Sequence, residues 1–236
     1  MAKIFLTAEW RKLAMANYTI DKKVLLPYLP SKTELDFLNN TCYVSLVGFR
    51  FQNVKLKGIS IPLHTNFEEV NLRFYVRYKS NEGWKRGVVF ISEIVPLRAI
   101  TLVANTLYGE KYATMPMAYS WTENDDALTV SYKWKKKAWN ELKVATSLQS
   151  FVIDEGSKEE FITEHYWGYA RLKDNGTNEY EVAHPRWEVY QTKDYQIDVD
   201  FESIYGKGFQ FLQQEKPASV FVAEGSAVSI KAGRKI

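Results

Sequence analysis

The sequence has a single cysteine, few histidines and almost no excess charge. Its 31 lysines and arginines stand against 28 aspartates and glutamates, which leaves a net charge of +3. So balanced a composition provides no electrostatic footprint for nucleic acid, which is therefore not an expected partner. The one cysteine, Cys42, excludes an intrachain disulfide and lies in an apolar run, where a buried and unreactive thiol is expected.

Signatures of metal and phosphate sites are missing as well. The three histidines, His64, His165 and His184, are far apart, and none belongs to a His-Glu-x-x-His or Cys-x-x-Cys pattern. No Gly-x-Gly-x-x-Gly, Walker or Gly-x-Ser-x-Gly pattern occurs either. We therefore expect no metal and no organic cofactor.

Long apolar runs are absent from the sequence. The run at the N-terminus is interrupted after a few residues, well short of a signal-peptide core or a membrane span. Together with the lone cysteine, this predicts a soluble, cytoplasmic protein with no membrane partner. The sequence leaves open whether the chain forms a homo-oligomer.

Aromatic residues, in contrast, make up 15% of the chain, and many of them recur in alternating runs. Aromatic side chains favour the half-buried surface of a sheet, so a mainly β protein is expected. No repeat, linker or low-complexity tract divides the 236 residues, which predicts a single domain over residues 1–236.

Two strands, residues 69–78 and 87–95, form a predicted hairpin around which the chain is organised. In the first strand one face is apolar and the other is polar, because alternate side chains point to opposite sides. The polar face consists of Glu69, Asn71, Arg73, Tyr75 and Arg77. Such a face is either solvated or lines a polar cavity.

Further elements follow from periodicity and capping residues. Helices are expected over residues 7–15, over residues 22–26 behind Asp21, from Pro96 to Gly109, after Ser157 and near residues 201–205. A strand that is apolar on both faces is expected over residues 42–51, and a short edge segment over residues 58–64. Further strands are expected over the rest of the chain as far as residue 230, and the tail 231–236 is expected to fray.

Two further groups are candidates for chemistry. Glu93 interrupts an apolar strand, so it must pair with an arginine such as Arg77, Arg86 or Arg98, or else have a raised pKa; an ion pair is the expectation. His165 stands in an aromatic segment that includes Tyr169, and such segments form either β-cores or ligand pockets. We favour a pocket for His165.

Several segments resemble the YqjF-like family, a bacterial group with no assigned activity. They are residues 42–51, 61–64, 69–77, 86–90 and 161–169 and the sequence His-Pro-Arg-Trp at residues 184–187. The resemblance spans nearly the whole chain. More distantly, the family is similar to acetoacetate decarboxylase, which implies a curved antiparallel β barrel or cone around a central pocket with a few flanking helices.

The resemblance to acetoacetate decarboxylase also implies roles for particular residues. Phe67-Glu-Glu69 is similar to the Tyr-x-Glu of the decarboxylases, which gives Glu69 the role of their glutamate. The Schiff-base lysine of the decarboxylases aligns with Tyr112, and Lys111 lies one residue earlier. In an extended segment this offset turns the lysine to the opposite side.

The sequence thus predicts a cavity for a small anionic or carbonyl-bearing molecule. The predicted acid, base or hydrogen-bonding groups are Glu69, Glu93, Lys111, Tyr112 and His165, and the predicted ligand contacts are Asn71, Arg73, Tyr75, Arg77 and Tyr169. Two alternatives remain: a Schiff-base lyase or decarboxylase of keto acids that uses Lys111, and a non-catalytic binding or interaction protein.

Overall fold

The computed structural model describes residues 3–107 and 109–236 of the chain. The protein is mostly β, and the strands within these residues belong to one curved sheet of 14 strands. None of the helices in the described residues is both long and apolar enough to cross a membrane.

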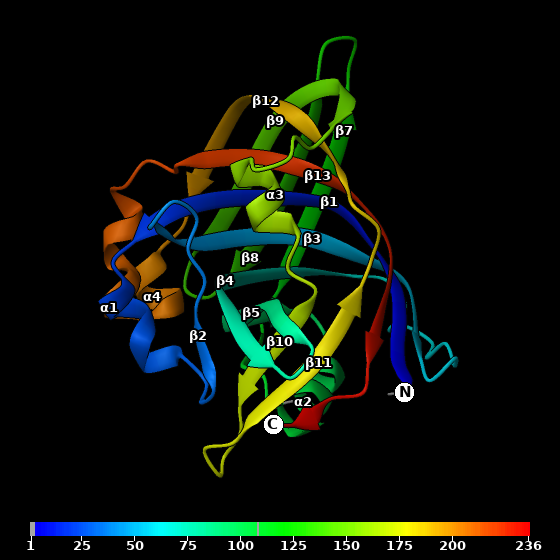
Figure 1. Cartoon of the computed structure of the whole chain (residues 1–236). Helices are drawn as coiled ribbons and strands as arrows, with labels where there is room; N and C mark the ends of the chain where they lie inside the picture. Colours follow the sequence, from blue (N-terminus) through cyan, green and yellow to red (C-terminus); the bar gives the residue numbers. More distant parts are fainter. Residues whose placement is uncertain (1–2, 108) are drawn as a thin grey trace.

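Seven strands of this sheet close into a ring (Figure 1). In spatial order they are β11 (Thr177–Ala183), β10 (Trp167–Arg171), β5 (Gly83–Val95), β4 (Phe67–Ser80), β3 (Cys42–Leu56), β1 (Ile4–Ile20) and β13 (Ser219–Lys231). β13 pairs back with β11 at Ile230 and Val182, which completes the ring. Neighbouring strands are antiparallel except β10 and β5, which are parallel.

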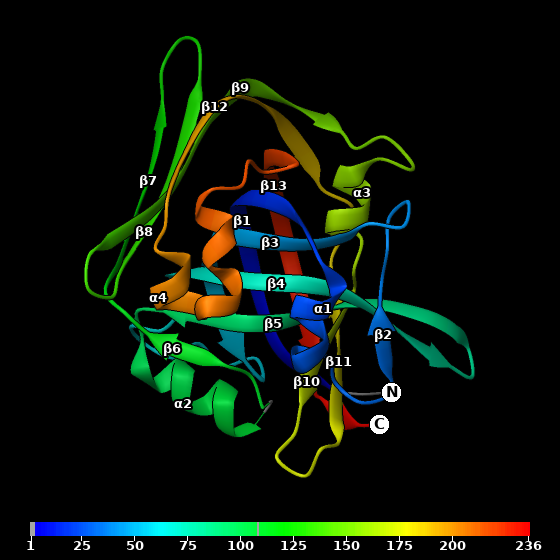
Figure 2. The same ribbon diagram turned by 90° about the vertical axis from the view of Figure 1, so that its left-hand side faces the viewer.

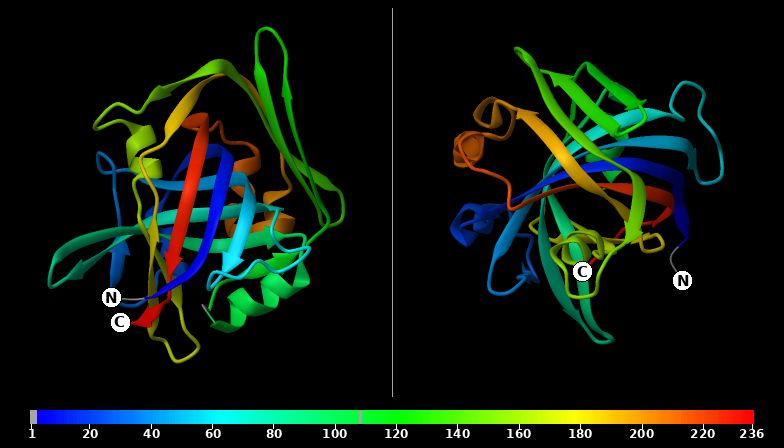
Figure 3. Two further views of the ribbon diagram at one scale, coloured as in Figure 1. Left: turned by 90° about the vertical axis from the view of Figure 1, so that its right-hand side faces the viewer. Right: turned by 90° about the horizontal axis from the view of Figure 1, so that it is seen from above.

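The remaining elements cover the ring or its ends (Figures 2 and 3). Four strands extend the sheet from β13: β12 (Glu188–Asp198), β9 (Trp139–Val152), β8 (Leu128–Lys135) and β7 (Met117–Glu123). Short strands β2 (Thr33–Leu35), β6 (Tyr112–Thr114) and β14 (Arg234–Lys235) pair with β4, β5 and β11. The helices are α1 (Lys22–Leu25), α2 (Arg98–Leu107), α3 (Lys158–Thr163) and α4 (Phe201–Tyr205), with 3-10 turns at Leu26–Tyr28 and Lys207–Gln213.

Two hydrophobic cores lie on opposite faces of the ring strands. Val44 and Leu46 of β3 pack on the outer face against β8, β9 and α4. Val47 and Phe49 of the same strand point into the ring. The predicted strand 42–51 is thus confirmed as apolar on both faces, because it is covered on both sides.

The helix predicted over residues 7–15 is wrong, because this segment is part of β1. The pairing of β1 with β3 shifts register between Arg11 and Ala14, and Lys12 has a positive φ of 52°. This bulge inserts an extra residue, so that Trp10 and Leu13 both point into the ring although they are three apart. A spacing of three imitates one face of a helix.

Most other sequence-based elements are confirmed, with two further errors. Asp21 and Ser157 cap α1 and α3 as predicted, each accepting a backbone N–H. The tail was expected to fray, but β14 pairs with β11 and the backbone N–H of Ile236 donates to Thr177 O at 2.9 Å. The segment 58–64 forms turns with a single bridge between Leu56 and Ile59 rather than a strand.

Candidate functional site

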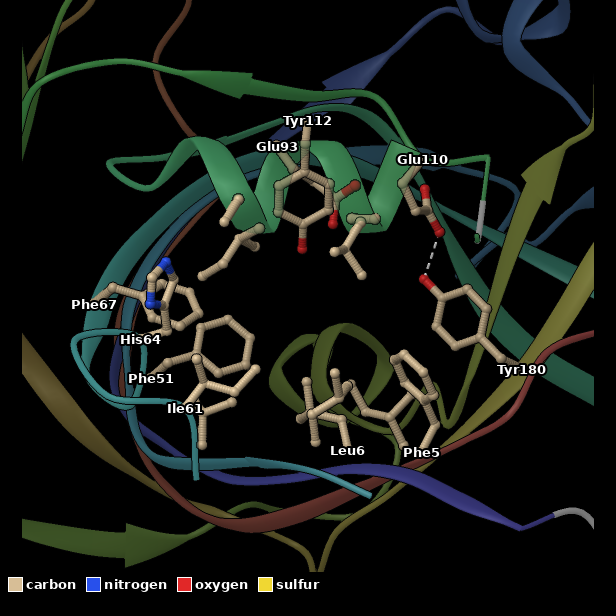
Figure 4. Close-up of a pocket in the computed structure, with 17 residues that line it drawn as sticks. Phe5, Leu6, Phe51, Ile61, His64, Phe67, Glu93, Glu110, Tyr112 and Tyr180 are labelled. Carbon is tan, nitrogen blue, oxygen red and sulfur yellow. Dashed lines mark hydrogen bonds between the residues drawn. The ribbon is translucent and has the colours of Figure 1, made fainter. Parts of the chain in front are cut away.

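The ring encloses two adjoining chambers. The outer chamber has a volume of about 230 Å³ and lies beneath α2. Figure 4 looks into it, with Glu93, Tyr112 and Glu110 along one wall and Phe5 and Leu6 opposite. The inner chamber measures about 70 Å³ and is bounded by the inward faces of the ring strands. The residues that line both chambers are Phe51, Glu93, Tyr112, Tyr180 and Ile230, so the two spaces meet at this point.

The polar side chains of the inner chamber come from neighbouring strand positions. Glu69, Asn71 and Arg73 alternate along β4 and point inward. Asn71 pairs directly with Glu93 of β5, and Glu93 pairs in turn with Tyr112 of β6. Side chains at paired positions lie on the same face of a sheet. Strand pairing therefore gathers these five residues into one cluster.

A β-bulge directs Glu93 into the ring. The register of β4 and β5 shifts between the pairs Leu72–Ser92 and Arg73–Phe90. Phe90 lines the inner chamber, whereas Ile91 and Ile94 belong to the outer core. Uninterrupted alternation from Phe90 would turn Glu93 outward, so the extra residue in the bulge places its carboxyl group in the chamber.

Hydrogen bonds fix the carboxyl groups of this cluster. Tyr112 Oη donates to Glu69 Oε2 at 2.9 Å, and Asn71 Nδ2 donates to Glu69 Oε1 at 2.9 Å. Tyr180 Oη donates to Glu110 Oε1 at 2.6 Å. Asn105 of α2 holds the backbone of Tyr112 from both sides, at 2.7 Å and 3.0 Å. The helix above the outer chamber thereby positions the tyrosine at the junction.

Burial raises the pKa of each carboxyl group in the cluster. It raises the pKa of Glu69 and of Glu110 to about 7. The pKa of Glu93 lies well above its ordinary value, first because of burial and then because of the negative charges of Glu110 and Glu69. The cluster therefore combines Glu93, whose neutral form is strongly favoured, with Glu69 and Glu110, which titrate near neutral pH.

Arg73 is a buried cation with no carboxylate partner within residues 3–107 and 109–236. Its side chain lies in the inner chamber, the residue is 7% exposed, and its Nε has no hydrogen-bond partner. It takes part in no ion pair among the described residues, although its charge lowers the pKa of Glu69. In the part of the chain that the structure describes, Asn71 Oδ1, Glu93 Oε2 and Trp10 Nε1 are also buried in this chamber without hydrogen-bond partners. Buried polar groups are normally satisfied, so these atoms mark a place where a polar ligand fits.

His165 enters the inner chamber from the segment that follows α3. Its Nε2 lies 3.1 Å from Asp36 Oδ2, and Arg86 Nε donates to the same oxygen at 2.7 Å. Burial lowers the pKa of His165 to about 4, which keeps the ring neutral at pH 7. A neutral ring that donates from Nε2 to Asp36 leaves Nδ1 as an acceptor, and Nδ1 is buried with no hydrogen-bond partner among the described residues.

The structure places four of the sequence-predicted site residues outside both chambers. Tyr75 lies behind His165 and its hydroxyl group bonds Ser45 Oγ at 2.6 Å. Arg77 is exposed and pairs with Glu34 at 2.6 Å. Tyr169 and Lys111 line a separate hollow on the outside of the ring, where the Lys111 ammonium lies 4.9 Å from the Tyr28 ring centre.

The ion pair predicted for Glu93 is wrong in the described structure. Arg77 pairs with Glu34 and Arg86 pairs with Asp36, whereas Glu93 Oε2 has no hydrogen-bond partner. Burial raises the pKa of this carboxyl group and so favours its neutral form, which costs less to bury than a carboxylate. Within the described ranges, no three His, Cys, Asp or Glu side chains are arranged so that they could hold a metal ion.

The hydrogen-bond network of the site includes Glu110, Tyr180 and Asp36, which were not among the sequence-predicted site residues. Glu110 precedes Lys111 and Tyr112, so a closer inspection of that tripeptide could have included it. Tyr180 and Asp36 reach the site from β11 and from the segment after β2. Neither carries a local signal, because pairing between strands distant in the sequence brings them close: β11 pairs with β10, and β2 pairs with β4.

Gly168 of β10 provides the space in which Tyr180 lies. A Cβ atom at this position would stand 2.1 Å from the Tyr180 ring. We expect Gly168→Ala to destabilise the fold by about 1–3 kcal/mol and to displace the Tyr180 hydroxyl group from Glu110. Urea unfolding and the near-ultraviolet circular dichroism of the tyrosines measure the two effects. An unchanged midpoint and spectrum would contradict this packing.

The closed, curved ring of strands around a buried chamber defines the acetoacetate-decarboxylase-like fold. Acetoacetate decarboxylase from Legionella pneumophila superposes with a TM-score of 0.67 at 14% identity, over 98% of this chain and 87% of the other. The enduracididine biosynthesis enzyme MppR complexed with pyruvate gives a TM-score of 0.69 at 10% identity, over 100% and 91% of the two chains.

The chain belongs to the DUF2071 family, described as an uncharacterized conserved protein, whose sequence pattern matches residues 7–227. It is also 27% identical over 196 residues to the uncharacterized protein YqjF of Bacillus subtilis. This alignment covers 81% of the present chain and 77% of YqjF. Both resemblances inferred from the sequence, to the YqjF-like family and to acetoacetate decarboxylase, are therefore confirmed.

Proposed function

We propose that the inner chamber binds a small molecule that carries a carboxylate next to a carbonyl group. The observation that carries this proposal is Arg73, a buried guanidinium group with no carboxylate partner in the described chain. An unpaired buried charge is costly, and an arginine fork matches a carboxylate in two parallel hydrogen bonds. A carboxylate ligand would therefore offset the cost of burying Arg73.

The proposed reaction is proton transfer at the carbon next to the carbonyl group. Glu69, with a pKa of about 7, removes a proton from this carbon, and the protonated Glu93 donates a proton to the carbonyl oxygen. A C–H bond breaks, an O–H bond forms, and the product is an enol. The reverse steps return the carbonyl compound with a solvent-derived proton.

Structural similarity supports a ligand of this chemical class. One protein of the same fold is described as complexed with pyruvate, which carries a carboxylate and a carbonyl group. A Schiff base, the alternative route, would need a lysine in the chamber. Lys111 lies in the separate hollow outside the ring, and Tyr112 faces the chamber at the next position. This arrangement favours proton transfer without a covalent lysine adduct.

The test is exchange of the methyl protons of pyruvate in deuterated water, followed by proton NMR. We expect the protein to accelerate exchange, and the rate to rise with pH through about 7 as Glu69 loses its proton. The exchange rate of the Glu69→Gln variant should be at least about 100-fold lower, because the variant lacks the general base. Glu68→Gln, one position earlier on β4, is the matched control and should keep the wild-type rate.

Three outcomes separate the possibilities. Exchange that depends on Glu69 supports the proposal. Pyruvate binding without exchange would leave a non-catalytic binding protein and contradict the proposed reaction. Absence of binding by any short oxo acid, measured by thermal shift at millimolar concentration, would contradict the carboxylate site itself.

A further inference from the structure

The outer chamber differs in chemistry from the inner one. Its walls are mostly apolar, with Phe51, Val54, Phe67, Ile100 and Val103 among them. Its polar groups, apart from His64, are Glu93, Glu110, Tyr112 and Tyr180, and three of these stand at the junction with the inner chamber. A ligand that occupies both spaces therefore meets polar groups at one end and hydrocarbon at the other.

The outer chamber is too large to be an entrance for a small oxo acid alone. Its volume of about 230 Å³ exceeds that of the inner chamber, about 70 Å³. A water molecule occupies ~30 Å³ of liquid, so the outer space would hold roughly seven or eight waters, most of them against apolar walls. Water in such a space gains few hydrogen bonds, and an apolar group that replaces it is favoured.

We propose that the ligand is amphipathic: a carboxylate head in the inner chamber at Arg73, and an unbranched hydrocarbon tail in the outer chamber under α2. This inference rests on the proposed function, because the same Arg73 holds the head. The junction formed by Glu93, Tyr112 and Tyr180 then surrounds the carbons nearest the carboxylate. The substrate class is a medium-chain oxo acid rather than a short one.

The mouth of the outer chamber agrees with a tail that points outward. Ile61 and Val103 line the chamber and are also 44% and 38% exposed. One lies on the turn after β3 and the other on α2. The apolar wall thus continues to the surface. The chamber is open at that end, so it sets no fixed limit on the length of the tail.

A chain-length series tests this inference. The probes are butanoate, hexanoate, octanoate and decanoate, titrated by calorimetry into the whole protein. We expect affinity to rise about fourfold for each methylene group that enters the outer chamber, which follows from the transfer of hydrocarbon out of water. Octanol, which has the tail without the carboxylate, should bind at least tenfold more weakly than octanoate.

A variant that fills the chamber is the second arm. Ala104 lines the outer chamber from α2. Ala104→Trp should weaken octanoate binding at least tenfold, whereas butanoate affinity should stay within about twofold of the wild-type value. Leu102→Trp is the matched control, because Leu102 is on the same helix but is 69% exposed and is not among the chamber residues. It should leave both affinities unchanged.

The outcomes distinguish this inference from the proposed function. If butanoate binds and longer acids bind no better, the tail site is wrong and the carboxylate site stands. If none of the acids binds, the proposed carboxylate site fails as well. If Ala104→Trp weakens butanoate and octanoate equally, the effect is structural, and the tail does not occupy the outer chamber.

Discussion

Replacement of Arg73 by methionine should weaken carboxylate binding by at least about 30-fold. Methionine keeps much of the volume of the arginine stem but removes the guanidinium group. Truncation of one partner of a buried, hydrogen-bonded charge pair costs about 2–5 kcal/mol in binding. Calorimetric titration of Arg73→Met with octanoate measures the loss. Retained affinity would mean that the head group binds elsewhere.

Arg77→Met is the control for this variant. Arg77 is four residues along the same strand and belongs to the same alternating face, but its side chain is exposed and paired with Glu34. Exposed ion pairs contribute little to stability. We expect octanoate affinity within about twofold of the wild-type value, and a loss equal to that of Arg73→Met would indicate a general effect of lost charge.

Stability should respond to Arg73→Met in the opposite direction. The free protein buries this guanidinium group without an ion-pair partner in the described chain, and replacement of such a group by an apolar side chain is often stabilising by about 1–4 kcal/mol. Urea unfolding at pH 5, where Glu69 is protonated, measures the gain. A purely structural arginine would instead lose stability on replacement.

The second large effect is a pH-dependent gain in stability of Glu110→Gln over the wild type. Burial raises the pKa of Glu110 from 4.5 to about 7. The folded state therefore binds this proton more tightly than the unfolded state. The resulting stability is complete below pH 4.5 and is lost as the pH rises through 7. Glutamine does not titrate, so the variant avoids this loss.

The free energy of unfolding, measured in urea from pH 4.5 to 8, tests this effect. The free energy of unfolding of Glu110→Gln minus that of the wild type should increase by about 2–3 kcal/mol from pH 4.5 to pH 8. His165 and Asp36 contribute equally to the pH dependence of unfolding in both proteins, so their contributions cancel in the difference. Glu155→Gln, at an exposed turn, controls for the removal of one charge. A constant difference for Glu110→Gln would contradict the raised pKa.

Alternation along β4 predicted which side chains share a face, but not how deep each one lies. Glu69, Asn71 and Arg73 all line the inner chamber. Arg77 follows the same alternation, yet four residues of extended chain carry it about 13 Å beyond Arg73, where it meets solvent. Depth depends on where the ring ends, and that is a property of the whole sheet.

Bulges explain the largest errors of the sequence analysis. The extra residue in β1 gave Trp10 and Leu13 the spacing of a helix, and the bulge in β5 turned Glu93 inward without an arginine partner. A bulge changes which face a side chain occupies without any strong mark in the sequence. Alternation is therefore reliable only between bulges.

The neighbouring positions Lys111 and Tyr112 illustrate what a one-residue offset does. Tyr112 lines both chambers and donates to Glu69, whereas Lys111 lies against Tyr28 on the outside of the ring. The sequence indicated this opposition because adjacent residues of an extended segment face opposite sides. It did not indicate Tyr180 or Asp36, whose positions depend on pairing between strands distant in the sequence and on hydrogen bonds to distant residues.

A crystal structure of the protein grown with 2-oxooctanoate tests the central claim most directly. We predict the carboxylate against the Arg73 guanidinium group, the carbonyl oxygen next to Glu93, and the tail beside Ile100 in the outer chamber. Electron density for the ligand outside the ring, with the inner chamber holding only water around Arg73, would contradict the account.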